Sequence, residues 1–293
     1  MFPAAEQAAG QENQNMEADL HCHSTCSDGS VTPELLARYA LRLGLDILAL
    51  TDHDTMAGTA HLQAAAAGTR LRIIPGVECT TKDSGSGRSV HVLCYAPERP
   101  AILEPLLLDT SAKRRRAKLD MAEKLAKLYP VLAVEDVPEL AQGSASLFEN
   151  HIMTALANAG ITNHPYGPLL ENLIGKHGSC HTPISYPDTL EVIDLMHEAG
   201  GFVVIAHPGQ FDSVELTLRL ARERRIEGIE CFHYRNSPAV LRQCLDTAAR
   251  YGLAVTGGSD FHGMNTKTPH PLGFCRIWGE YSRAFLEALD GSG

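Results

Sequence analysis

Short apolar segments alternate with amphipathic helical segments along most of this chain, and this alternation restricts the fold more than any other feature. "DILAL" (46–50) contains a continuous apolar run, as is typical of a strand buried on both faces, and "GFVVIAH" (201–207) and "IEGIECF" (226–232) are further expected strands. Helical patterns follow at 214–224 and 238–251. Strands that alternate with helices predict a largely parallel α/β sheet, and about seven of them predict a TIM-like barrel.

The alternation stops in the middle of the chain. A charged helical segment at 110–129 is followed by a second amphipathic segment at 147–160, and then by loops rich in Gly, Pro, Asn and His. We therefore expect a small helical insertion domain at 111–185 that covers the active site as a lid. The barrel would be formed by the two flanking parts of the chain, 17–110 and 186–293.

Composition excludes several classes of protein. A net charge of −10 argues against a protein that coats long nucleic acids, although a short oligonucleotide stays possible as a ligand. The 8 cysteines form no CxxC pair, which favours a reduced, cytoplasmic protein. No apolar run reaches membrane-spanning length, and nothing indicates an obligate protein partner. Residues 1–16 lack a basic start and an apolar stretch, so we expect a disordered leader and not a secretion signal.

Histidines and carboxylates gather where the expected strands end. In a parallel barrel the carboxyl ends of all strands meet at one rim, and this rim carries the active site. Side chains two residues apart on a strand share a face, so the imidazoles of His21 and His23 should point inward together while Cys22 points away. The residues at these strand ends are His21, His23, Asp52, His53, Asp54, Glu78, His91, His207, Asp260 and His262.

So many buried imidazoles and carboxylates need a compensating charge. Divalent cations supply it, and a site of nitrogen and oxygen ligands without thiolate suits Mn²⁺, Fe²⁺ or Zn²⁺. A set of hydrogen-bonded polar strand ends without a metal is the alternative, but several separate strand ends would have to share this composition by chance.

Six motifs of the chain resemble, in order, those of the PHP (polymerase and histidinol phosphatase) superfamily. The resemblance covers residues 17–275 and is closest to stand-alone metal-dependent phosphoesterases with a helical insert. It implies a distorted (β/α)7 barrel with a cluster of two to three divalent transition metals. The motifs are "DLHCHSTCSDGS", "LALTDHDT", "PGVE", "VHVLCY", "VIAHPG" and "GGSDFHG".

The resemblance also implies a role for each ligand position. The first metal would be held by His21, His23, Glu78 and Asp260. Glu78 would bridge to a second metal, completed by His91 and His207. The third metal would be held by Asp28, His53 and His262. Every position carries a competent ligand, which argues against a non-catalytic metal-binding barrel.

These ligands predict phosphoester hydrolysis. A hydroxide shared by two cations is a strong nucleophile at neutral pH, and the same cations neutralise phosphoryl oxygens. We expect a phosphatase or phosphodiesterase for a small phosphorylated metabolite or nucleotide, such as a nucleotide 3′,5′-bisphosphate or a cyclic sugar phosphate. The alternatives are a 5′–3′ exonuclease on short oligonucleotides and a histidinol-phosphate phosphatase. The expected catalytic residues are Glu78, Asp260, His207 and His233.

Substrate contacts are expected from the insertion and from the loop after 226–232. In the insertion, Lys113, Arg115 and Arg116 could bind a second phosphate and His151 the scissile one. Phe148 and Tyr166 could offer stacking surfaces. On the barrel, His233 and Arg235 could contact substrate, and His233 could protonate the leaving group. For each of these residues the alternative is an ordinary capping or surface role.

Overall fold

The computed structural model describes residues 16–291, so most of the expected leader at 1–16 lies outside the described residues. Eight strands form one sheet in the order β7-β6-β5-β4-β3-β2-β1-β8. The strands are β1 (Glu17–Asp19), β2 (Ile47–Leu50), β3 (Arg72–Lys82), β4 (Ser89–Tyr95), β5 (Phe202–Ile205), β6 (Gly228–Phe232), β7 (Ala254–Gly257) and β8 (Ile277–Trp278).

The sheet curls into a nearly closed barrel, which confirms the predicted fold. Its two ends meet beyond β1 and β7, where Leu20 N donates to Gly257 O at 3.1 Å and His23 N donates to Phe261 O at 2.9 Å. An isolated parallel bridge between Cys22 and Phe261 continues this seam. The carboxyl ends of β1 and β7 are thereby brought side by side.

Two strands depart from the expected parallel arrangement. β4 runs antiparallel to both β3 and β5, because β3 and β4 form a hairpin without a helix between them. Near the carboxyl end of the chain, β8 has only two residues, which pair antiparallel with β1. These two strands make the barrel distorted.

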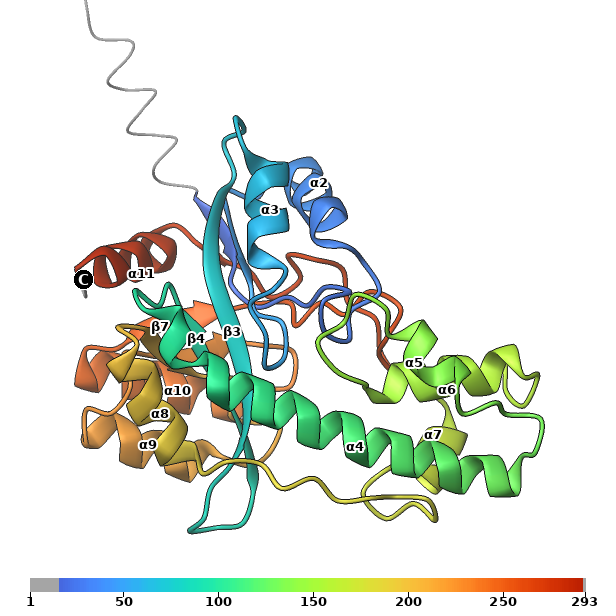
Figure 1. The fold of residues 1–293 in the computed structure, drawn as a ribbon. Helices are drawn as coiled ribbons and strands as arrows, with labels where there is room; N and C mark the ends of the chain where they lie inside the picture. The colour runs from blue at the N-terminus through green and yellow to red at the C-terminus, as the bar shows by residue number, and fades with distance from the viewer. Residues whose placement is uncertain (1–15, 292–293) are drawn as a thin grey trace, which may run out of the picture.

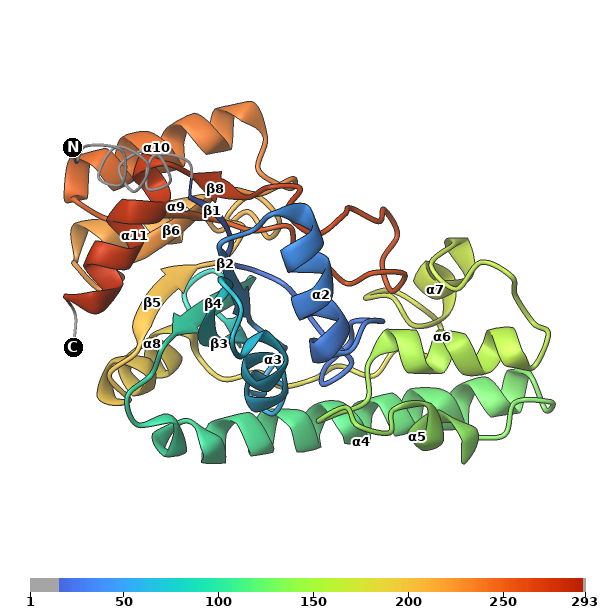
Figure 2. The same cartoon turned by 90° about the horizontal axis from the view of Figure 1, so that it is seen from above.

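Helices cover the outside of the barrel (Figures 1 and 2). The helix α2 begins with Thr32 as N-cap and Pro33 in its first turn, and ends at Gly44 in the left-handed region. The barrel helices are α2 (Pro33–Leu43), α3 (Thr59–Ala66), α8 (Thr189–Glu198), α9 (Val214–Arg222), α10 (Pro238–Tyr251) and α11 (Glu280–Asp290).

The remaining helices extend to one side of the barrel, and α4 reaches along the whole length of this extension (Figure 2). They are α4 (Glu104–Leu128), α5 (Asp136–Leu140), α6 (Glu149–Asn158) and α7 (Pro168–Leu173), with a short 3₁₀ helix at Pro100–Ile102 before α4. Their buried apolar residues, from Met121 to Cys180, form one hydrophobic cluster of their own. None of the helices in residues 16–291 is both long and apolar enough to cross a bilayer.

The predicted domain boundary at 111–185 is open to a direct test. Leu156 is fully buried in the cluster of the insertion, and Leu93 is fully buried in the barrel. Leu156→Ala should cost about 2–5 kcal/mol because it leaves a cavity. If the insertion is a separate cooperative unit, amide hydrogen exchange should accelerate in 111–185 alone, whereas Leu93→Ala should accelerate exchange in the strands. Equal acceleration everywhere in both variants would show one cooperative unit.

Candidate active site

The fold brings the nine expected metal ligands together at one rim of the barrel. His21 and His23 directly follow β1, and their Nε2 atoms lie 3.2 Å apart. Cys22 points the other way, and its thiol donates to Ala49 O at 3.2 Å. The others lie in β3 or β4 or beyond the ends of β1, β2, β5 and β7: Asp28, His53, Glu78, His91, His207, Asp260 and His262.

The Glu78 carboxylate lies at the centre of this cluster and is fully buried. Its Oε1 accepts hydrogen bonds from His91 Nδ1 at 2.8 Å and His207 Nε2 at 2.9 Å. Its Oε2 faces three imidazoles at 3.0–3.3 Å, those of His21, His23 and His53. One carboxylate is thus shared by five imidazoles, which is the arrangement that a bridging ligand requires.

Four groups of donor atoms converge closely enough to hold a cation, with all atoms of a group within 4.8 Å of one another. Three of them correspond to parts of the expected cluster: His21, His23, Glu78 and Asp260; His23, Asp28, His53 and His262; His53, Glu78 and His91. The fourth group, His21, Glu230 and His233, includes a glutamate that sequence reasoning did not select.

The donor atoms fit a metal centre because several are buried without a hydrogen bond. Within residues 16–291, Glu78 Oε2, His23 Nδ1, His53 Nδ1 and His207 Nδ1 have no hydrogen-bond partner. Buried polar atoms of this kind are costly unless another charge or ligand satisfies them. All donors in the three groups are imidazole nitrogens and carboxylate oxygens, the set that suits Mn²⁺, Fe²⁺ or Zn²⁺.

Two ligands sit on strained backbone. His207 has φ of 26° and Asp260 has φ of 49°, in the left-handed region that residues other than glycine rarely adopt. Strain of this kind costs about 1–3 kcal/mol per residue and is concentrated at functional sites. The surrounding structure therefore forces both side chains into the cluster.

Charges within the cluster shift its pKa values in opposite directions. Burial alone would lower the pKa of His23, but Asp260 and Glu78 outweigh it and raise that pKa to about 10. Burial would raise the pKa of Glu78, but the charges of His91 and His21 hold it well below its usual range. Without a bound cation, protons therefore compensate the carboxylates.

Three buried acids support the ligands from outside; the sequence placed Asp52 at a strand end without a role as a ligand, and did not indicate Glu230 or Asp19. Glu230 is fully buried, accepts from His21 Nδ1 at 2.9 Å, and accepts from the His207 backbone N–H at 2.7 Å. With Nδ1 of His21 engaged in this way, its Nε2 faces the cluster. Asp19 and Asp52 accept hydrogen bonds from Ser259 and Ser24 in the neighbouring loops. An acid within an apolar strand, as in "GIECF", is the signal that could have revealed Glu230.

A cavity of about 700 Å³ opens above the cluster. The barrel contributes seven of the nine expected ligands and also Lys82, Tyr186, Tyr234 and Arg235, and the insertion contributes Lys118, Glu149 and Tyr166 among others. Lys118 is buried and pairs with Glu149 at 2.5 Å. The insertion thus forms part of the substrate cavity.

The expected phosphate contacts from "KRRRAK" need a correction. Lys113, Arg115 and Arg116 lie on the exposed side of α4 and do not line the cavity, and Lys113 pairs with Asp109 one turn away. The helical repeat instead turns Arg114 and Lys118 inward, because residues four apart share a face. Both are buried.

Arg114 joins the insertion to the barrel. Its Nη2 pairs with Asp54 at 2.5 Å, and its guanidinium stacks on Phe148 at 4.7 Å and on Tyr186 at 5.7 Å. Burial raises the pKa of Asp54 even though Arg114 opposes that shift. Phe148 in turn lies 6.1 Å from the His53 ring, so this expected stacking residue packs beneath the site. The other one, Tyr166, lines the cavity.

The two expected substrate histidines also need correction. His151 Nδ1 accepts from Phe148 N at 3.1 Å at the start of α6, and the residue lines a separate small cavity with Asn150. The His233 side chain is buried and does not line the cavity above the cluster. His233 Nδ1 accepts from the Arg235 N–H, and its Nε2 lies 3.4 Å from Asp260 Oδ2. It is placed to orient this ligand.

The chain is similar to a known protein family and to several of its members. A model of the PHP domain matches residues 19–142. The chain is 36% identical to the phosphoribosyl 1,2-cyclic phosphate 1,2-diphosphodiesterase of Eggerthella lenta, over 88% of this chain and 98% of that one. It is 31% identical to the 5′-3′ exoribonuclease of Escherichia coli (83% and 84%) and 28% identical to the 3′,5′-nucleoside bisphosphate phosphatase of Chromobacterium violaceum (93% and 99%).

A solved structure shows that the similarity extends to the fold. A crystal structure from Bifidobacterium adolescentis, described as a metal-dependent phosphoesterase, superimposes with a TM-score of 0.83 at 31% identity. The match covers 92% of this chain and 96% of that one. Similarity in sequence and in fold extends over almost the whole chain, and therefore this protein belongs to the PHP family.

Proposed function

We propose that this metal-dependent phosphoesterase hydrolyses a phosphate ester on a ribose that carries a second phosphate. The observation that carries the proposal is the cluster around Glu78, where nine ligands converge at the floor of a cavity rimmed by cations. The substrates after which two relatives are named, a phosphoribosyl cyclic phosphate and a nucleoside 3′,5′-bisphosphate, both combine a ribose with two phosphate positions.

The nine ligands are proposed to hold two to three divalent cations, in the groups expected from the sequence. Such cations, when bound, lower the pKa of a water molecule and neutralise phosphoryl oxygens. Glu78 is placed to be shared between two of these groups, because five imidazoles surround its two oxygens. Glu230 holds His21 and the backbone of His207 in place, and His233 orients Asp260.

The rim of the cavity supports recognition of a second phosphate. Lys82, Lys176 and Arg235 line it from three different elements, and within residues 16–291 none of them forms an ion pair with a carboxylate. The Arg235 guanidinium stacks on Tyr234 at 5.1 Å, which restricts its position. A cation held in this way can bind a phosphate far from the scissile bond.

All 8 cysteines are free, and most of them are buried. We therefore retain a reducing, cytoplasmic compartment as part of the proposal, since such thiols persist where disulfides are not formed.

The proposed activity is tested by phosphate release from the Mn²⁺-loaded protein. We expect a nucleoside 3′,5′-bisphosphate or a phosphoribosyl cyclic phosphate to react with at least about tenfold higher kcat/KM than ribose 5-phosphate, because one further charge-assisted contact contributes about 1.5 kcal/mol or more. Histidinol phosphate and short RNA are assayed in the same way. A preference for histidinol phosphate would contradict the proposal.

Glu78→Gln should remove metal from the protein. The amide keeps the shape of the side chain but loses the anionic charge that both proposed cations share, so metal per chain and activity should fall together. Cys22→Ser is the matched control, because the thiol faces Ala49 and away from the cluster. Elemental analysis measures metal content, and far-ultraviolet circular dichroism confirms folding. Metal retained by Glu78→Gln but lost by Cys22→Ser would refute the ligand assignment.

Metal binding should release protons and strengthen as the pH rises from 6 to 9. The pKa of His23 is raised to about 10 in the metal-free site, so this imidazole carries a proton throughout that range and must lose it to bind a cation. Titration calorimetry of Mn²⁺ binding in buffers of different ionisation enthalpy counts the protons released. Binding of Mn²⁺ without release of protons would show that His23 is not a ligand.

Arg235→Gln should raise KM for doubly phosphorylated substrates by about tenfold or more, with little change for singly phosphorylated ones. Lys113→Gln removes the same charge from the exposed side of α4 and should not change KM for either type of substrate. Steady-state kinetics on both substrate types measure the difference. An equal effect of Arg235→Gln on both types would remove Arg235 from second-phosphate recognition.

A further inference from the structure

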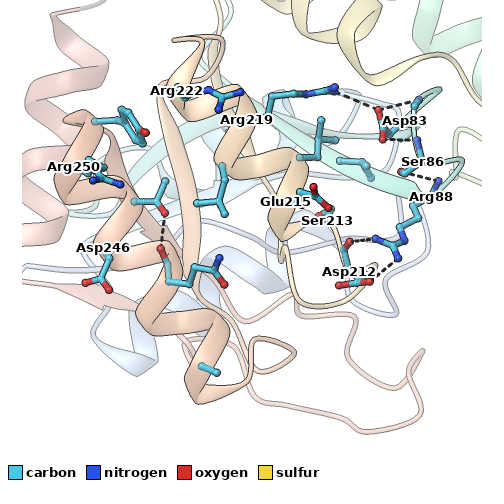
Figure 3. A pocket seen from close by; sticks show the side chains of 18 of the residues that line it. Asp83, Ser86, Arg88, Asp212, Ser213, Glu215, Arg219, Arg222, Asp246 and Arg250 are labelled. Atoms are coloured by element: carbon cyan, nitrogen blue, oxygen red, sulfur yellow. Dashed lines mark hydrogen bonds and ion pairs between the residues drawn. The ribbon is translucent and has the colours of Figure 1, made fainter.

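A second cavity lies on the outside of the barrel, between the β3–β4 hairpin and the helices α9 and α10 (Figure 3). It measures about 1080 Å³. Asp83 and Arg88 line this cavity, whereas their neighbours Lys82 and Ser89 line the active-site cavity. This division follows from the hairpin, in which consecutive side chains point to opposite faces. One hairpin therefore separates the two cavities.

All cationic side chains that line this cavity are arginines, and we call it the arginine groove: Arg88, Arg219, Arg222, Arg242 and Arg250. Two of them are neutralised, since Arg88 pairs with Asp212 at 2.8 Å and Arg219 with Asp83 at 3.6 Å. Figure 3 shows both pairs as dashed lines.

The other three arginines, Arg222, Arg242 and Arg250, are exposed and form no ion pair within residues 16–291. Two acids of the groove, Glu215 and Asp246, also stand without an ion pair there. The unpaired charges leave a small positive excess in a chain of net charge −10. A concentration of guanidinium groups on such a chain favours an anionic ligand at this place.

The chemistry and spacing of these arginines favour a ligand with several phosphates. Guanidinium groups bind phosphate oxygens through two parallel hydrogen bonds, which a lysine cannot do. Arg242 and Arg250 are eight residues apart on α10, which corresponds to about 12 Å along a helix axis. Tyr251 also lines the groove and offers an aromatic surface to a base. A single phosphate would use only one end of this groove.

We propose that the arginine groove binds the trailing nucleotides of a short single-stranded oligonucleotide whose terminal phosphate ester lies in the active-site cavity. This placement of the terminal ester rests on the proposed function. The oligonucleotide would cross the β3–β4 hairpin, which borders both cavities. Glu215 and Asp246 oppose extended polyanions, so the length of strand that binds is restricted to a few nucleotides.

Binding of labelled RNA to the full-length, Mn²⁺-loaded protein tests this proposal. The probes are a dinucleotide and a hexanucleotide made resistant to hydrolysis by phosphorothioate linkages, and fluorescence anisotropy measures their affinity. The groove variant is Arg242→Ala/Arg250→Ala. The control is Arg38→Ala/Arg42→Ala, which removes the same charge from exposed positions on α2.

The hexanucleotide should bind the wild-type protein at least about tenfold more tightly than the dinucleotide, and the groove variant should lose about tenfold for the hexanucleotide alone. The slope of log affinity against log salt should fall by about 1.4, or 0.7 for each lost phosphate contact. Unchanged hexanucleotide affinity in the groove variant, or an equal loss in the α2 control, would overturn the proposal. So would arginine-dependent binding of anionic phospholipid vesicles without length-dependent RNA binding.

The same samples separate this proposal from the proposed function. Phosphate release from a nucleoside 3′,5′-bisphosphate should be unchanged in the groove variant, because neither arginine lines the active-site cavity. If wild-type protein releases this phosphate but binds no hexanucleotide, the groove proposal alone fails. If hexanucleotide binding depends on the arginines but no small bisphosphate reacts, the proposed function alone fails.

Discussion

The burial of one carboxylate among five imidazoles is the constraint on which the rest of the site depends. Glu78 is fully buried, and its two oxygens face five imidazoles that come from the ends of three strands and from the neighbouring strand β4. Such a carboxylate is stable in the interior only with compensating charge. The barrel brings these imidazoles and carboxylates together, because its closure between β1 and β7 places His21 beside Asp260.

A supporting layer fixes this cluster and ties it to the insertion. Glu230, Asp19 and Asp52 hold ligands and ligand loops from outside the cluster. From the insertion, Asn150 donates to the Asp28 carbonyl at 3.4 Å, and Ser144 donates to Ser27 O at 2.6 Å. The loop that carries Asp28 is therefore held by both parts of the chain. Movement of the insertion would be coupled to the geometry of that ligand.

The proposed substrate contacts and the expected metal ligands are separated in space, which is consistent with a family whose members act on different phosphate esters. The ligands lie at the floor of the cavity, while Lys82, Lys176 and Arg235 lie at its rim on elements that can vary independently. The arginine groove lies beyond the hairpin that carries Glu78 and His91 on its two strands. A change of substrate would therefore require no change in the ligands.

The sequence by itself determined the barrel and the gathering of the ligands, because strand period and strand ends are local properties. It also determined that Cys22 points away from the site. Only the tertiary structure decided which cations face the cavity: the periodicity of α4 turns Arg114 and Lys118 inward, but charge composition alone favoured Lys113, Arg115 and Arg116. The structure also places His151 and His233 outside the lining of this cavity, because burial and hydrogen bonding, which no local pattern specifies, decide their positions. The antiparallel β4 likewise arises from a hairpin whose strand direction no apolar pattern specifies.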